Sequence, residues 1–112
     1  MFTLLAGGAS GDEAHVLDAR LTATSSGSHR IEVTVSHPDT GWDHYADKWD
    51  VLGPNGQVLG TRVLYHPHVD EQPFTRSLGG IDIPPGVKQV QVRAHDSVHG
   101  YGGKTITVEV PR

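Results

Sequence analysis

The chain has 112 residues, enough for one autonomous core but too few for a second domain of ordinary size. Its formal net charge is −4 at pH 7 with no basic cluster, so the sequence indicates neither nucleic acid nor an anionic membrane as a partner. The absence of cysteine excludes disulfides and thiolate chemistry, and no apolar run approaches the roughly 20 residues of a membrane span, so no membrane insertion is expected.

The chain opens with MFTLLAGGASG, a short apolar patch followed by small residues. This opening lacks the basic start and the full-length apolar region of a complete signal peptide. We expect residues 1–13 to be a flexible N-terminus or the remnant of a signal peptide, and residues 14–112 to form a single domain.

Alternation of apolar and polar residues predicts β-strands along the rest of the chain. The pattern is clearest where Ile31, Val33 and Val35 alternate with polar residues, and no segment keeps a helical period. The 14 glycines and 7 prolines supply turns between the runs, among them the hairpin signal Pro54-Asn55-Gly56. The expected strands cover residues 15–24, 31–36, 48–53, 57–65, 74–83, 90–94 and 105–110.

Seven short strands at this spacing predict an all-β fold, an antiparallel immunoglobulin-like or fibronectin-like β-sandwich. Trp49 is expected to face its core, and the position of Trp42 is left open. Since connections alternate between the two ends of such a fold, the loops after the second, fourth and sixth strands share one pole. Six of the eight histidines fall in or beside these loops: His37, His44, His66, His68, His95 and His99. His15 and His29 lie outside them and are expected at the surface.

The sharpest local motif is His66-Pro67-His68. In extended backbone, residues i and i+2 point to the same side about 7 Å apart, so both rings can converge on one ion. Proline restrains this backbone, and imidazole suits Zn²⁺, Cu²⁺ and Ni²⁺ when a third ligand is present. With Met1 as the single methionine, any copper is expected as Cu²⁺. The expected ligands are His66, His68, His99 and His44; the residues expected to support them are His37, Asp43, Asp70 and Asp96.

The alternative is that the histidines only tie the loops together, as buried imidazoles do when they bond backbone carbonyls and hydroxyls. His37 continues the inward parity of the second strand, so a structural role at the edge of the core is favoured for it. His95 has the opposite parity to its apolar neighbours and is expected on the outer face of a sheet. Glu71 and Arg76 are expected to form an ion pair across their loop, although Arg76 could instead pair with Asp96 or Asp47.

The segments GWDHYAD, HPHVDEQPFTRSL and DSVHGYGG resemble a family of small exported bacterial proteins that has no established activity. The resemblance covers about residues 30–110. It implies a periplasmic or secreted single-domain protein, and it supplies no catalytic residues.

The sequence therefore predicts a small exported β-sandwich that binds copper, zinc or nickel through its loops, as a carrier, buffer or sensor. The alternative is a protein-binding or adhesion-like module with structural histidines, in which Trp42 and the tyrosines provide the contact area. An enzyme is not expected, because the chain offers little wall for a cleft and nothing resembles a nucleophile elbow. Zinc-dependent hydrolysis, with Glu71 as the nominal base, is the minor third reading.

Overall fold

The computed structural model describes residues 13–25 and 27–112, and within them the fold is all-β with no helix. The expected all-β class is therefore confirmed. The prediction for residues 1–13 falls almost entirely outside the described residues. The strands are β1 (His15–Ala23), β2 (Ser28–Ser36), β3 (Ala46–Leu52), β4 (Val58–Val63), β5 (Phe74–Asp82), β6 (Gln89–Asp96), β7 (Gly100–Tyr101) and β8 (Ile106–Glu109).

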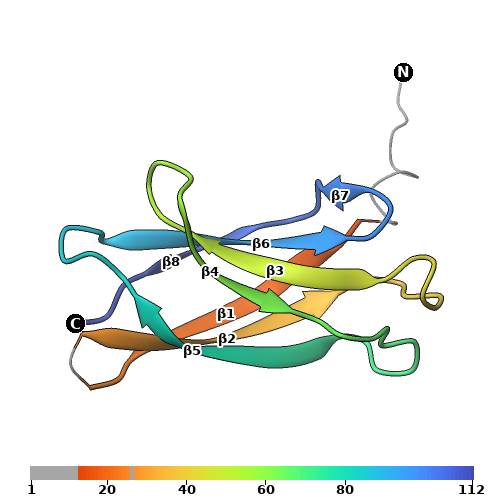
Figure 1. The fold of residues 1–112 in the computed structure, drawn as a ribbon, viewed down its shortest axis with the longest axis horizontal. Helices are drawn as coiled ribbons and strands as arrows, with labels where there is room; N and C mark the ends of the chain where they lie inside the picture. Colours follow the sequence, from red (N-terminus) through yellow and green to blue (C-terminus); the bar gives the residue numbers. More distant parts are fainter. Residues whose placement is uncertain (1–12, 26) are drawn as a thin grey trace.

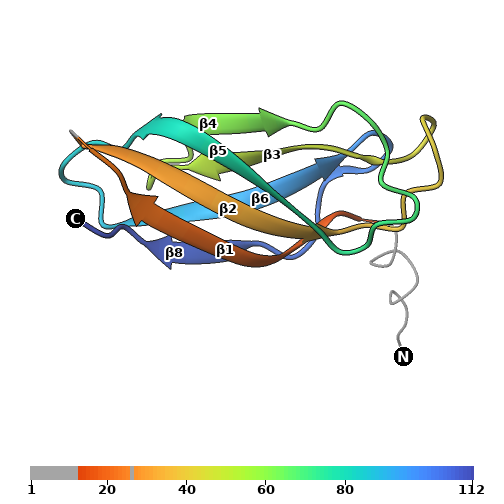
Figure 2. The ribbon, with the colours of Figure 1, turned by 90° about the horizontal axis from the view of Figure 1, so that it is seen from below.

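Two antiparallel sheets pack face to face (Figures 1 and 2). One has the order β1-β2-β5, and the other has the order β4-β3-β6, with β7 and β8 both pairing β6. Each expected strand matches an observed one. The structure adds β7, two residues within what the sequence indicated as a glycine-rich loop; Gly100 has φ +74°, in the left-handed region that favours glycine.

The core lies between the two sheets, and it is formed by the apolar residues that occupy every second position of the strands. Ile31, Val33 and Val35 of β2 are fully buried, and so is Trp49 of β3, as expected. The expectation for His29 is wrong. Its ring is buried and its Nε2 lies 2.9 Å from the carbonyl oxygen of Pro111, so the C-terminal segment covers it.

Three loops lie together at one end of the sandwich, on the right in Figure 1: residues 37–45, 64–73 and 97–99. We refer to these residues as the histidine pole. Hydrogen bonds join the loops: the His37 backbone N–H donates to Gln72 Oε1 at 2.9 Å, and the Tyr45 N–H donates to Ser97 Oγ at 3.1 Å. The alternation of loops between the two ends thus brings together residues that are distant in the chain.

A buried carboxylate on the outer face of the second sheet fastens β7 and β4 to β3. Asp50 accepts hydrogen bonds from Tyr101 Oη at 2.6 Å, Thr61 Oγ1 at 2.7 Å and Arg93 Nε at 3.1 Å. The Arg93 guanidinium also stacks on Tyr101, 3.7 Å from the ring centroid. Burial alone would raise the pKa of Asp50, but the hydrogen bonds from Tyr101, Thr61 and Arg93 outweigh it and lower that pKa.

This lowered pKa makes the stability of the protein depend on pH in acid. The pKa of Asp50 is lower in the folded state than in the unfolded state. Its contribution to the free energy of unfolding is therefore fully present above the unfolded-state pKa of about 3.9, and it is lost as pH falls through the folded-state pKa. We expect the free energy of unfolding to decline less steeply below about pH 4 in Asp50→Asn than in the wild type. Urea denaturation across pH measures the slopes, with the exposed Asp82→Asn as control. Equal slopes for Asp50→Asn and the wild type would contradict the assignment.

Candidate metal site

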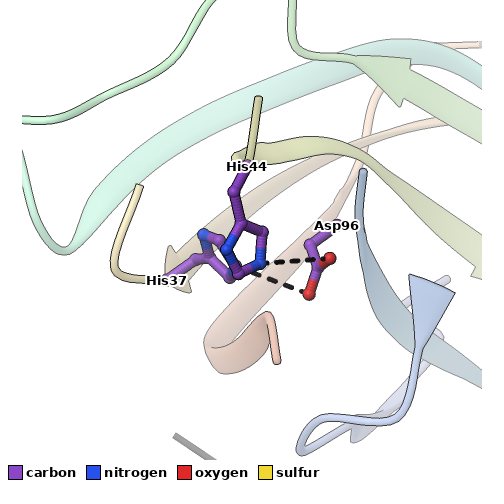
Figure 3. Close-up of side chains that lie close together, drawn as sticks. All are labelled: His37, His44 and Asp96. Atoms are coloured by element: carbon purple, nitrogen blue, oxygen red, sulfur yellow. Dashed lines mark ion pairs between the residues drawn. The ribbon is translucent and has the colours of Figure 1, made fainter. Parts of the chain in front are cut away.

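His37, His44 and Asp96 bring their ligand atoms together at the histidine pole. His37 follows the last residue of β2, His44 lies in the next loop, and Asp96 ends β6. One ligand atom from each lies within 4.8 Å of the others (Figure 3). His37 Nε2 is 3.4 Å from Asp96 Oδ2, and His44 Nε2 is 3.5 Å from Asp96 Oδ1.

These separations suit a small metal ion. With bonds of about 2.1 Å, tetrahedral ligands lie roughly 3.4 Å apart, and each imidazole nitrogen has a different oxygen of Asp96 at about that distance. His44 Nε2 and Asp96 Oδ2 are buried and have no hydrogen-bond partner. Buried polar atoms are normally satisfied, and leaving one unsatisfied costs about 1–3 kcal/mol. An ion between these atoms would satisfy both.

Asp39, which no pattern in the sequence singled out, orients the group. Its Oδ1 accepts from the His37 ring Nδ1 at 2.5 Å and from the Ala46 backbone N–H at 3.1 Å. Its Oδ2 accepts from the His68 backbone N–H at 2.7 Å. A neutral His37 ring that donates from Nδ1 carries its lone pair on Nε2, the atom that faces Asp96. The sequence feature that could have indicated this role is the spacing His37-Pro38-Asp39, because His66 and His68 were singled out by the same spacing around a proline.

The backbone of the next turn holds Asp96. Its Oδ1 accepts from the backbone N–H groups of Val98 at 2.8 Å and His99 at 2.5 Å. These bonds fix the carboxylate at the end of β6 and leave Oδ2 directed toward His37. The local fold therefore orients this oxygen before any ion arrives.

The structure distributes the predicted ligands unequally. His44 belongs to the three-residue group, together with His37 and Asp96, which the sequence suggested only as supporting residues. His99 is exposed, and its ring centroid lies 5.0 Å from that of His44. His37 can fill both the structural role that its parity favoured and a ligand role. Its Nδ1 faces Asp39, which holds the ring in place, and its Nε2 faces Asp96 in the candidate site.

His66 and His68 lie beside each other but outside that group. Their ring centroids are 5.0 Å apart; His66 is exposed, whereas His68 is 5% exposed and stacks on Phe74 at 4.0 Å. Burial, followed by the charges of Arg76 and His66, lowers the pKa of His68. Among the described residues the pair joins no group of three metal-ligating side chains, so its role as the primary ligands stays a prediction.

The remaining candidates lie apart from the group. Asp43 and Asp70 are exposed. Arg76 Nη2 donates to Glu71 Oε1 at 3.2 Å, which is the expected loop brace and lowers the pKa of Glu71. His95 pairs with Asp47 at 2.6 Å on the outer face of the second sheet, as its parity predicted.

The fold and the site define an all-β protein of two antiparallel sheets with a buried His/Asp group that could hold a metal ion. The chain is 43% identical over 97 residues to a protein of Halomicrobium mukohataei named "Putative lipoprotein". That match covers 87% of this chain and 47% of the relative, so the chain spans about half the length of the curated relative it matches. No family model matches the sequence.

Two solved structures share the fold. Superoxide reductase (neelaredoxin) from Archaeoglobus fulgidus, in its reduced form, matches with a TM-score of 0.55 and 10% identity, over 96% of this chain and 95% of that one. A hypothetical protein from Pyrococcus horikoshii OT3 matches with a TM-score of 0.53 and 12% identity, over 87% and 90% of the two chains. At these identities the likeness concerns the fold alone. In the part of the chain that the structure describes, no helix has the length and apolar character needed to cross a membrane.

Proposed function

We propose that the protein binds one divalent transition-metal ion, copper or zinc in the first place and nickel as a further candidate, through His37, His44 and Asp96. The observation that carries this proposal is a pair of buried atoms without hydrogen-bond partners, His44 Nε2 and Asp96 Oδ2, in a group whose ligand atoms lie within 4.8 Å of one another beside the oriented His37 ring. Three protein ligands leave one coordination position open. In this role the protein is a carrier, buffer or sensor on an immunoglobulin-like sandwich.

The donor types narrow the choice of metal. Two imidazole nitrogens and a carboxylate oxygen suit Zn²⁺, Cu²⁺ and Ni²⁺, whereas Cu⁺ prefers thiolates and thioethers. The chain has no cysteine, and its one methionine, Met1, begins the sequence. A groove of about 980 Å³ lies at the other end of the sandwich, between the segments 52–54 and 85–91, away from the group. We therefore propose binding rather than catalysis, with zinc-dependent hydrolysis as the lesser candidate.

We further propose that the protein is exported, to the periplasm, the cell envelope or the medium. The support is the lipoprotein name of the Halomicrobium mukohataei relative and the resemblance of the loop motifs to small exported proteins. This location is compatible with a carrier or sensor that meets metal ions outside the cytoplasm.

Calorimetric titration of metal-stripped protein tests the site. For the wild type at about pH 7.5 we expect one-to-one binding of Zn²⁺ or Cu²⁺, weakened at about pH 5.5 because protonated imidazoles do not bind metal. His44→Ala is expected to weaken binding by about a hundredfold, since it removes a ligand from a partly exposed position without opening the core.

The matched control is the double variant His66→Ala/His68→Ala at the same pole. It is expected to keep most of the affinity if His37, His44 and Asp96 hold the ion. If it abolishes binding while its circular dichroism spectrum matches that of the wild type, and His44→Ala does not abolish binding, the HxH pair is the site. If the wild type binds no metal more tightly than a surface histidine pair does, the proposed function is wrong.

A second candidate is a protein-binding module, and the exposed apolar side chains of the histidine pole favour it. Trp42 is 67% exposed and Tyr65 is 76% exposed, and the exposed Val69 and Val98 also lie on loops of this pole. Aromatic side chains of this kind are enriched where proteins bind partners. Partner binding that survives chelation and is lost in Trp42→Ala would favour this candidate.

A further inference from the structure

His44 is the one member of the proposed metal group whose side chain is exposed to solvent. The side chains of His37 and Asp96 are 0% exposed, whereas the side chain of His44 is 20% exposed. An ion must therefore reach the buried atoms past His44. The inference below rests on the proposed function and concerns how the ion reaches that site.

His99 packs against His44, the exposed member of the group. Its exposed ring is 5.0 Å from the His44 ring, centroid to centroid, and the His44 ring is 4.7 Å from that of His37. The three imidazoles form a continuous series from solvent to the buried carboxylate of Asp96. The His99 backbone N–H donates to Asp96 Oδ1 at 2.5 Å, which anchors His99 beside this carboxylate while its ring stays outside.

We propose that His99 is a capture ligand, which binds the ion transiently at the surface and passes it to His44 and then to the buried group. A hydrated ion loses its waters most easily when a protein donor replaces each one in turn, and a metal site needs such a path. The three imidazoles supply successive nitrogen donors of one chemical type along this path. A ligand that acts only on the way in lowers the barrier for binding and release equally, so it changes both rates and leaves the affinity unaltered.

Stopped-flow kinetics with Cu²⁺ as the probe distinguish this role from permanent ligation. Quenching of tryptophan fluorescence reports binding, since Trp42 lies two residues from His44. In His99→Ala we expect the association and dissociation rates both to fall by about tenfold, with Kd unchanged within about twofold. The substitution keeps the backbone N–H, and with it the bond to Asp96. His66→Ala, which removes another exposed imidazole of the pole, is the matched control and is expected to alter neither rate.

Each other outcome is informative. A rise in Kd carried by faster dissociation alone would make His99 a permanent ligand and overturn the capture role. Equal slowing in His99→Ala and His66→Ala would assign the effect to the general charge of the pole and also overturn it. If the wild type binds Cu²⁺ and His99→Ala has unchanged association and dissociation rates, the capture role is wrong but the metal site stands. Wild-type protein that binds neither Cu²⁺ nor Zn²⁺ refutes the metal site itself and the capture role with it.

Discussion

Replacing Asp39 with alanine is expected to lower the free energy of unfolding by about 3 to 5 kcal/mol. The carboxylate is buried and accepts hydrogen bonds from the His37 ring and from the backbone N–H groups of Ala46 and His68. Alanine would leave these donors without an acceptor, and each unsatisfied buried group costs about 1–3 kcal/mol. Urea denaturation followed by circular dichroism measures the loss.

Two further variants define what Asp39 contributes. Asp43→Ala removes an exposed carboxylate from the same loop and is expected to change stability by no more than about 0.5 kcal/mol. Asp39→Asn keeps one oxygen acceptor but replaces the other oxygen with a donor, so an intermediate loss is expected. A loss below about 1 kcal/mol in Asp39→Ala would show that Asp39 does not hold the pole together.

Replacing Trp49 with alanine is expected to cost about 3 to 5 kcal/mol, because the indole is fully buried at the centre of the core. The indole Nε1–H has no hydrogen-bond partner, so Trp49→Phe loses volume but no hydrogen bond. We expect Trp49→Phe to cost only about 1 to 2 kcal/mol.

Trp42 offers a control of the same residue type for the Trp49 series. It is largely exposed, and Trp42→Ala is expected to change the free energy of unfolding by no more than about 0.5 kcal/mol. Denaturant unfolding of all three variants gives the comparison. If Trp49→Phe is as destabilising as Trp49→Ala, the indole N–H has a partner in solution and the packing argument is wrong.

The strands could be predicted because one face of each is buried, which imposes a period of two on the sequence. This signal located β2, whose Ile31, Val33 and Val35 are all fully buried. It could not locate β7, which has two residues and forms only because β6 offers it an edge. His29 has the same parity as Ile31, Val33 and Val35, so the alternation does place it on the inward face. What the alternation could not show is that Pro111, which is far away in the sequence, covers its ring.

The sequence predicts the position of the candidate site and names the three members of its group, His44 as a ligand and His37 and Asp96 as supporting residues, but it does not single them out. Alternation of loops between the ends of the sandwich placed the right three loops together. A local motif then chose His66 and His68, whereas the group that forms joins His37, His44 and Asp96 from separate segments. The spacing His37-Pro38-Asp39 could have indicated the bond between Asp39 and the His37 ring, but not the bond from the His68 backbone, which belongs to a different loop.

The shared carboxylate of Asp39 also bears on local motion. The amide hydrogens of Ala46 and His68 belong to different segments, yet both bond to the same side chain. A single fluctuation that swings this side chain outward therefore exposes both amides to solvent at once. In hydrogen–deuterium exchange we therefore expect the two positions to open as one cooperative unit with a common opening free energy, although no strand ladder connects them.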